Sequence, residues 1–220
     1  MVKAYGLSVA SSRLRGLNSG GGGFQQSPFG GLDLRRADRG LFIGRFQPFH
    51  LGHLEAAKYI LARMDELIIA VGSAQYSHSL DNPFTAGERI EMIRGTLEAE
   101  GIDPCNYYLI PVEDINVHSV WVPHVASRVP RFQVVYSNEP LTRRLFEEAG
   151  YRVEPIPFFE RERYSATEIR RRILEGEAWE ELVPSPVAMF IKSIGGDQRI
   201  RALASTDKPR PGESGGNLHG

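Results

Sequence analysis

The stretch Gly44-Arg45-Phe46-Gln47-Pro48-Phe49-His50-Leu51-Gly52-His53 decides the fold of this 220-residue chain. It follows an apolar run at 41–43, which predicts a buried strand, and it precedes a helical pattern over 52–64. A strand therefore enters a glycine-containing turn that opens a helix. In α/β proteins such a turn can hold nucleotide phosphates, because the helix start offers free N–H groups and the positive end of its dipole.

Strand and helix signals alternate after this turn, which predicts a parallel sheet with right-handed crossovers. Further strands are expected at 67–71, 107–112 and 132–136, with a short extended piece at 151–157. Helices are expected at 85–100, 119–128, 139–149, 169–175 and 186–194. Capping-box patterns at 85–88 and 165–168 open two of these helices. Ligands bind beyond the carboxyl ends of such strands, so the loops between strands and helices are expected to share one binding rim.

Composition separates a folded unit from two flanking segments. Residues 1–39 are rich in Gly and Ser, and residues 205–220 are polar with Gly and Pro. Both are expected to be disordered, because they bury too little apolar surface to offset the entropy lost on ordering. The intervening residues, 40–204, are long enough for one domain.

Charge and cysteine content exclude several classes of protein. The chain has 26 basic and 27 acidic residues, so no overall basic excess argues for a nucleic-acid-binding surface, although a balanced chain can still carry local basic clusters. It contains no apolar stretch long enough to span a membrane, and a secretory signal is not expected, since no long apolar block follows Lys3, Arg13 and Arg15. The single cysteine, Cys105, excludes an internal disulfide and predicts a cytoplasmic location.

His50 and His53 are open to several interpretations from the residues alone. They can be solvated, cap the helix, bind a metal or donate to phosphate. No third ligand stands nearby at a recognisable metal-binding spacing, which argues against a metal site. Gly52 permits close backbone approach, and imidazole N–H groups at this place can stabilise charge that grows on a phosphate in a transition state.

Two motifs together resemble the signatures of the nucleotidyltransferase superfamily: His-x-Gly-His at 50–53, and the helix start Ser165-Ala166-Thr167-Glu168-Ile169-Arg170. The segments 44–50, 72–75, 82–89 and 163–165 narrow the resemblance to the archaeal-type nicotinamide-nucleotide adenylyltransferases, over residues 40 to about 200. That family makes NAD and pyrophosphate from nicotinamide mononucleotide (NMN) and ATP, with a divalent cation, usually Mg²⁺. The resemblance implies a homo-oligomer and a Rossmann-like, doubly wound parallel α/β sheet with a small C-terminal helical part.

The resemblance also implies roles for individual residues. Catalysis is expected from His50, His53, Arg170 and Arg45. ATP is expected to contact Gly44, Phe46, Gly52, Asn138, Ser165 and Thr167. NMN is expected to contact Ser73, Gln75, Asp114, Ile115 and Trp121. No metal ligand is expected from the protein, because ATP phosphates and water can hold the ion.

Several of these residues have structural alternatives. Arg45 can be a surface residue, Trp121 a core residue, and Asp114 and Asn138 caps of the helices that follow them. Ser165 has a sound role as a helix cap. Some members of the family carry a basic residue at the position of Asp81. An acidic residue there is not expected to make the phosphate contact that the resemblance would otherwise imply.

Other functions are compatible with the same fold. The acceptor can be pantetheine phosphate or FMN, the transfer can be cytidylyl, or the domain can be a non-catalytic nucleotide sensor. Trp121 and the segment 44–50 favour NMN, and the complete set of His50, His53 and Arg170 argues against a pure sensor. The NMN phosphate is already an anion, so the reaction needs positioning and charge stabilisation rather than a protein base.

Overall fold

The computed structural model describes residues 37–157 and 164–206, which form a five-stranded sheet covered by helices. The strands are β1 (Arg39–Gly44), β2 (Glu66–Val71), β3 (Tyr107–Pro111), β4 (Val134–Tyr136) and β5 (Arg152–Glu154). The α-helices are α1 (Leu51–Leu61), α2 (Ala86–Ala99), α3 (His118–Arg128), α4 (Pro140–Glu148), α5 (Ala166–Glu175), α6 (Ser185–Ser193) and α7 (Gly196–Thr206). Short 3-10 helices are η1 (Pro104–Asn106) and η2 (Glu180–Leu182).

All neighbouring strands are parallel, in the order β3-β2-β1-β4-β5. Gly44 pairs with Val71, and Phe42 pairs with Tyr136, so the carboxyl ends of β1, β2 and β4 lie along one edge. Successive strands run outward from β1 to β3 on one side and from β4 to β5 on the other. This confirms a doubly wound sheet whose switch point, the usual ligand position in such folds, lies between β1 and β4.

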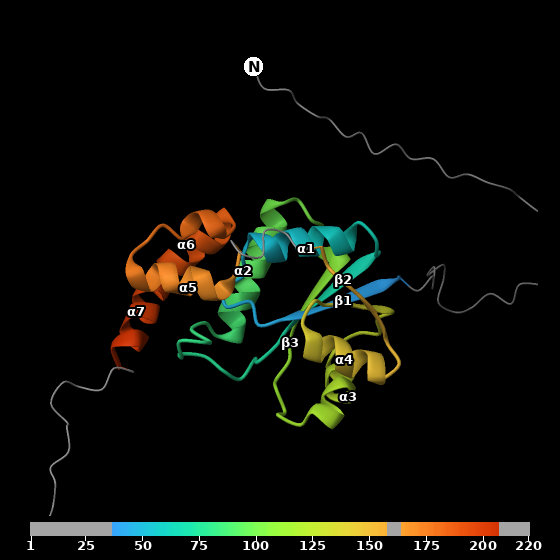
Figure 1. Cartoon of the computed structure of the whole chain (residues 1–220). Helices are drawn as coiled ribbons and strands as arrows, with labels where there is room; N and C mark the ends of the chain where they lie inside the picture. Colours follow the sequence, from blue (N-terminus) through green and yellow to red (C-terminus); the bar gives the residue numbers. More distant parts are fainter. Residues whose placement is uncertain (1–36, 158–163, 207–220) are drawn as a thin grey trace, which may run out of the picture. The chain divides into compact units, whose positions relative to one another are not determined.

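The two faces of the sheet have separate hydrophobic cores because side chains alternate along each strand. Phe42 and Ile69 point to the face covered by α1 and α2, whereas Leu41 and Ile68 pack with residues of α3 and α4. Figure 1 shows α1 on one side of the sheet and α3 and α4 on the other. A strand covered on both faces reads as a continuous apolar run, as Leu67 to Val71 does.

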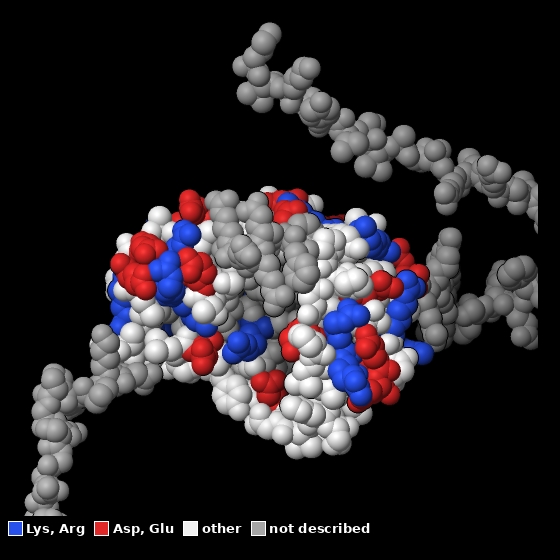
Figure 2. Space-filling model, in the orientation of Figure 1, with Lys and Arg blue, Asp and Glu red and all other residues white. Residues whose placement is uncertain are grey.

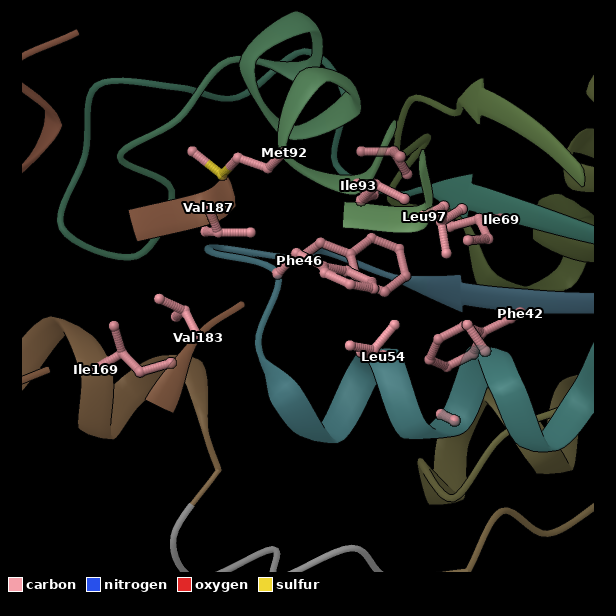
Figure 3. Close-up of a cluster of buried hydrophobic side chains, with 14 of the residues drawn as sticks. Phe42, Phe46, Leu54, Ile69, Met92, Ile93, Leu97, Ile169, Val183 and Val187 are labelled. Atoms are coloured by element: carbon pink, nitrogen blue, oxygen red, sulfur yellow. The ribbon is translucent and has the colours of Figure 1, made fainter. Parts of the chain in front are cut away.

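The C-terminal helices α5, α6 and α7 extend the core beside α2 (Figure 1). Figure 3 shows Ile169 of α5, Val187 of α6 and Met92 of α2 in the same buried cluster as Phe46 and Leu54. The predicted C-terminal helical part is therefore confirmed, and its apolar side chains are continuous with the core that supports the strand–turn–helix segment at 44–53.

The sequence prediction missed α7 and shifted several element ends. Helix α1 ends at Leu61 rather than 64, β4 begins at Val134 rather than 132, and the extended piece at 151–157 contains only the short β5. The segments predicted to be disordered, 1–39 and 205–220, lie mostly outside the described residues, and the described fold reaches slightly into both, since β1 begins at Arg39 and α7 ends at Thr206.

Helix α7 is attached to the start of α2 by a partly buried ion pair. The Arg199 guanidinium donates to both carboxylate oxygens of Glu88, each at 2.8 Å, and to the Pro83 carbonyl oxygen at 3.1 Å. The same Glu88 accepts from the Thr85 N–H in a complete capping box. Arg199 therefore fixes the loop before α2 as well as the helix itself.

We predict that Arg199→Met lowers the free energy of unfolding by about 2 kcal/mol, because charged hydrogen bonds are lost and Glu88 keeps a partly buried charge. Arg94→Met is the matched control, since Arg94 forms an exposed pair with Glu98 on α2. That change should cost about 0.5 kcal/mol or less. Urea unfolding measures both, and equal losses would contradict the assignment.

Candidate functional site

A cavity of about 570 Å³ opens beyond the carboxyl ends of β1 and β4. The β1–α1 turn, the loop after β4 and the start of α5 all contribute to its wall. Nine of the predicted site residues line it: Arg45, Phe46, His50, Gly52, His53, Asn138, Ser165, Thr167 and Arg170. The structure therefore brings together the predicted catalytic and most of the predicted ATP-binding residues.

A second cavity, of about 370 Å³, lies between the loop after β3 and the starts of α3 and α4. Its wall includes Asp114 and Trp121, both predicted to contact NMN. Arg45 and Glu139 line this cavity and the larger one. Two ligands bound in the two cavities would therefore meet at Arg45.

Many charged side chains on the surface around the site form ion pairs with one another. Figure 2 shows basic side chains in a hollow between two groups of mixed charge near α5 and α4. On these helices Arg171 of α5 pairs with Glu177, and Arg143 of α4 pairs with Glu147. By contrast, Arg45 is exposed, and its guanidinium makes no hydrogen bond or ion pair with any residue that the structure describes. Arg45 is thus available to an anionic ligand.

His50 and His53 cap α1 by a reciprocal pair of hydrogen bonds. The His53 N–H donates to Nδ1 of His50, and the His50 N–H donates to Nδ1 of His53, each at 3.3 Å. The two rings stack with centroids 3.5 Å apart. Because a neutral imidazole with Nδ1 as acceptor carries its hydrogen on Nε2, both rings present an Nε2–H donor. The capping alternative is therefore correct, and it leaves a donor on each ring for a ligand.

Burial keeps both imidazoles neutral. Desolvation lowers the pKa of His50 to about 3, and it lowers the pKa of His53 well below its usual value, with a smaller contribution from the neighbouring His50. Protonation of either Nδ1 would also remove a capping acceptor. The pair can therefore donate hydrogen bonds from Nε2 without carrying charge at pH 7.

Phe46 has a structural role that the sequence prediction did not assign to it. Its φ of 52° turns the chain sharply after β1, and its ring packs against Phe42, Phe49 and the edge of His53. A Cβ atom on Gly44 would lie 2.8 Å from this ring, so glycine is required there by close packing. Gly44 itself lines neither cavity.

Gln47 and Arg170 connect the β1–α1 turn to distant segments. The Gln47 amide donates to the Phe84 carbonyl oxygen at 2.9 Å and accepts from the Phe84 N–H at 3.0 Å. The Gln47 carbonyl oxygen accepts from Nη1 of Arg170 at 2.9 Å. Arg170 is only 8% exposed, and burial lowers the pKa of its guanidinium while Asp81, 3.7 Å away, opposes that shift. Asp81 thus stands beside the predicted catalytic arginine.

Two helices start at the larger cavity. Ser165 caps α5 by accepting from the Glu168 N–H at 3.1 Å, which confirms its capping role. The predicted capping box is only half formed, because the Glu168 carboxylate pairs with Arg171 and Arg172 instead of the Ser165 N–H. The starts of α1 and α5 therefore both present the positive ends of their dipoles to the same space.

Several predicted NMN-binding residues support the smaller cavity without lining it. The Ser73 hydroxyl donates to the Asp114 carboxylate at 2.5 Å, and the Gln75 amide exchanges two hydrogen bonds with the Asp114 main chain, at 2.7 and 3.0 Å. Asp114 does not cap α3, whose N-cap is Val117. Ser73, Gln75 and Ile115 are not among the residues that line either cavity.

Trp121 is half-buried, between the core and the smaller cavity. Its ring contacts Phe146 edge to face, with centroids 5.6 Å apart, and Trp121 also lines the smaller cavity.

Asn138 does not cap α4, because Glu139 accepts from the Leu141 and Thr142 N–H groups. The Asn138 amide instead pairs in both directions with the main chain of Ile156, at 2.6 and 3.0 Å, and so joins the ends of β4 and β5.

The described residues contain no group of three or more His, Cys, Asp or Glu arranged to hold a metal ion. The side chains that meet in the larger cavity are imidazoles and guanidinium groups, and Glu139 already accepts two main-chain hydrogen bonds. These groups suit an anion. The cavity therefore offers little to a bare cation but could receive one already bound to phosphates.

Comparison with known proteins agrees with this geometry. The cytidylyltransferase-like family model matches residues 41–172. The chain is 54% identical over 170 residues to the nicotinamide-nucleotide adenylyltransferase of Saccharolobus solfataricus, covering 77% of this chain and 99% of that protein. It is 53% identical over 173 residues to the protein of the same name from Thermoplasma volcanium, covering 79% of this chain and 96% of that protein.

Solved structures support the fold. A bifunctional NMN adenylyltransferase/ADP-ribose pyrophosphatase from Francisella tularensis, in complex with AMP and a manganese ion, superposes with a TM-score of 0.63 at 24% identity. The match covers 77% of this chain and 53% of that one, so this chain spans about half of that protein's length.

We predict that the neutral histidine pair makes the fold sensitive to acid. Below pH 6.5 the two imidazoles bind protons in the unfolded chain but stay neutral in the folded state. Each histidine therefore lowers the free energy of unfolding by up to about 1.4 kcal/mol per pH unit. His50→Asn removes one titrating ring and keeps a side-chain acceptor at the N-cap. Between pH 6.5 and 5 it should lose about 2 kcal/mol less than the unmodified protein. Parallel pH–stability curves would contradict the assignment.

Proposed function

The chain belongs to the nicotinamide-nucleotide adenylyltransferases of the cytidylyltransferase-like family, and we propose that its two cavities hold ATP and NMN side by side while it transfers AMP from ATP to NMN. The products are NAD and pyrophosphate. The larger cavity holds the ATP phosphates and adenosine, and the smaller one holds the nicotinamide end of NMN. The observation that carries this proposal is that Arg45 lines both cavities.

The transfer is a direct displacement at the α-phosphorus of ATP. An oxygen of the NMN phosphate forms a bond to that phosphorus, and the bond from the phosphorus to the bridging oxygen of pyrophosphate breaks. The electron pair of that bond leaves with pyrophosphate. Since the attacking oxygen is already negative, no protein group has to remove a proton. The work left to the protein is alignment of the two phosphates and stabilisation of their charge.

The residues around the larger cavity supply that stabilisation. The Nε2–H groups of His50 and His53 donate to ATP phosphate oxygens as fixed, neutral donors. Arg170 approaches the same phosphates from α5, and the starts of α1 and α5 add oriented N–H groups. Arg45 reaches the point where the two phosphates meet. Donors already held in place need no rearrangement when charge moves in the transition state.

The nicotinamide ring is proposed to stack on Trp121, because a cationic pyridinium is attracted to the face of an indole. Asp114 lies on the same wall and can accept from the carboxamide N–H. Ser73 and Gln75 act on NMN indirectly, since they hold Asp114 by its carboxylate and its main chain. Ser73 thus keeps its predicted connection to NMN through a second residue.

Mg²⁺ is the proposed cation and arrives bound to the ATP phosphates, where it offsets their negative charge. A homo-oligomer and a cytoplasmic location complete the proposal; the exposed free thiol of Cys105 is in keeping with a reducing compartment. No helix in the described ranges has the length and hydropathy needed to cross a membrane.

We predict that His53→Ala lowers kcat by about 100-fold, the loss typical of removing one preorganised donor, while the Kd for ATP changes only a few-fold. His124→Ala is the matched control, because His124 is a half-buried residue of α3 whose ring bonds to the Glu113 carbonyl oxygen and which lines neither cavity. Pyrophosphate release measures turnover, and titration calorimetry measures ATP binding. Turnover equal to that of the control would refute the role of His53.

We predict that Trp121→Leu raises the KM for NMN about 10-fold, equivalent to roughly 1.4 kcal/mol of lost stacking, and leaves the KM for ATP unchanged. Phe132→Leu is the control, because it also removes an aromatic contact to Phe146 but does not line the cavity. A rise in the KM for ATP instead would reverse the assignment of the two cavities.

A further inference from the structure

Arg89 is a fully buried charged residue that the proposed reaction does not use. It lies in the first turn of α2 and is 0% exposed. Its guanidinium donates only to main-chain carbonyl oxygens, and no carboxylate accepts from it among the residues that the structure describes. A buried cation without a paired anion is costly, so its retention requires a reason.

The partners of Arg89 belong to the turns that follow β1 and β2. Nη1 donates to the carbonyl oxygens of Arg45 at 2.8 Å and Gly72 at 2.7 Å, and Nη2 donates to that of Ser73 at 3.2 Å. Nε donates to the Thr85 carbonyl oxygen of its own helix at 3.2 Å. One planar group therefore holds the ends of two adjacent strands to the start of α2.

Both turns lead to residues of the site. Arg45 carries the guanidinium shared by the two cavities, and its own carbonyl oxygen is the Arg89 acceptor. Ser73 holds the Asp114 carboxylate, which lines the smaller cavity. The main chain on the phosphate side and on the NMN side is thus fixed by the same buried side chain.

Only arginine suits this arrangement. Its fork of N–H groups is rigid and directs donors along several fixed directions, whereas a lysine ammonium is a single point on a flexible stem. Burial lowers the pKa of Arg89 to about 10, so the group is still charged at pH 7, and Asp114 partly offsets the effect of burial. Arg89 therefore also places a positive charge behind the site.

We propose that Arg89 is a positioning residue for adenylyl transfer. It fixes the position of the Arg45 side chain by binding the Arg45 main chain, and it fixes the position of Asp114 by binding the main chain of Ser73, which holds the Asp114 carboxylate. The inference rests on the proposed function, because it takes Arg45 to act on the reacting phosphates and Asp114 to act on NMN.

The test is a double-mutant cycle between Arg89→Lys and Arg45→Ala. Arg89→Lys should lower kcat about 10- to 100-fold, a range expected for misplacement by less than about 1 Å, and should raise the KM for NMN several-fold. In the Arg45→Ala background the same lysine change should lower kcat less than about 3-fold, because the residue it positions is already gone. The increase in KM for NMN should persist there, since it passes through Ser73.

Met92→Ala controls for general destabilisation, because Met92 is a buried apolar residue of the same helix that touches neither turn through a hydrogen bond. It should lower the unfolding temperature and leave kcat unchanged at temperatures where the protein stays folded. If Arg89→Lys does not fold, Arg89→Gln replaces it, as glutamine keeps two donors and buries no charge.

Three outcomes overturn the inference. An equal loss of kcat from Arg89→Lys in both backgrounds means that Arg89 acts independently of Arg45. A kcat for Arg89→Lys equal to that of the unmodified protein removes any positioning role. Unchanged turnover in Arg45→Ala alone overturns the proposed role of Arg45, and the inference with it, whereas a normal loss in Arg45→Ala without coupling overturns only the role of Arg89.

Discussion

The reciprocal hydrogen bonds between His50 and His53 are the constraint on which the site depends. Each ring uses Nδ1 to cap the helix start, so each must be neutral and must carry its hydrogen on Nε2. The same bonds close the first turn of α1 and direct its dipole at the larger cavity. The hydrogen bonds that form the helix start therefore also fix the two Nε2–H donors. Phe46 and Phe49 pack against the ring of His53.

The rest of the molecule holds this turn in place from several directions. Gln47 connects it to Phe84 and to Arg170, and Arg89 connects it to the end of β2. The loop that contains Phe84 is fixed in turn by the pair of Glu88 with Arg199 of α7. Charge that develops in a transition state is stabilised best by donors in fixed positions. The contacts of Gln47, Arg89 and Glu88 are main-chain or partly buried hydrogen bonds, which hold this turn and its donors in place.

The parts of this arrangement that were predictable from sequence depend on local signals. The apolar run before Gly44, the cap residues Thr85 and Ser165 and the spacing of His50 and His53 are each written within a few residues, and the resemblance to known enzymes added roles for Arg45, Arg170 and Trp121. The alternation of strands and helices was sufficient to predict a parallel sheet and the shared rim, and the resemblance added the doubly wound order.

The parts that could not be predicted depend on contacts between distant residues. Nothing near Arg89 indicates that its acceptors are the carbonyl oxygens of Arg45 and Gly72, because those contacts exist only once β1 and β2 are paired. Helix α7 was missed since its polar sequence is stabilised by a pair with Glu88, 111 residues away. Asn138 was a candidate cap for α4, but its side chain is hydrogen-bonded to the main chain of Ile156, and Glu139 caps the helix instead.

The most direct measurement of the central claim is the nitrogen NMR spectrum of the histidine rings, in the free protein and with a non-hydrolysable ATP analogue at pH 7. We predict neutral rings for His50 and His53, with no hydrogen on Nδ1 and one on Nε2, in both states, and a shift of the Nε2–H signals when the nucleotide binds. A ring protonated at Nδ1, or Nε2–H signals that do not respond to the nucleotide, would contradict it.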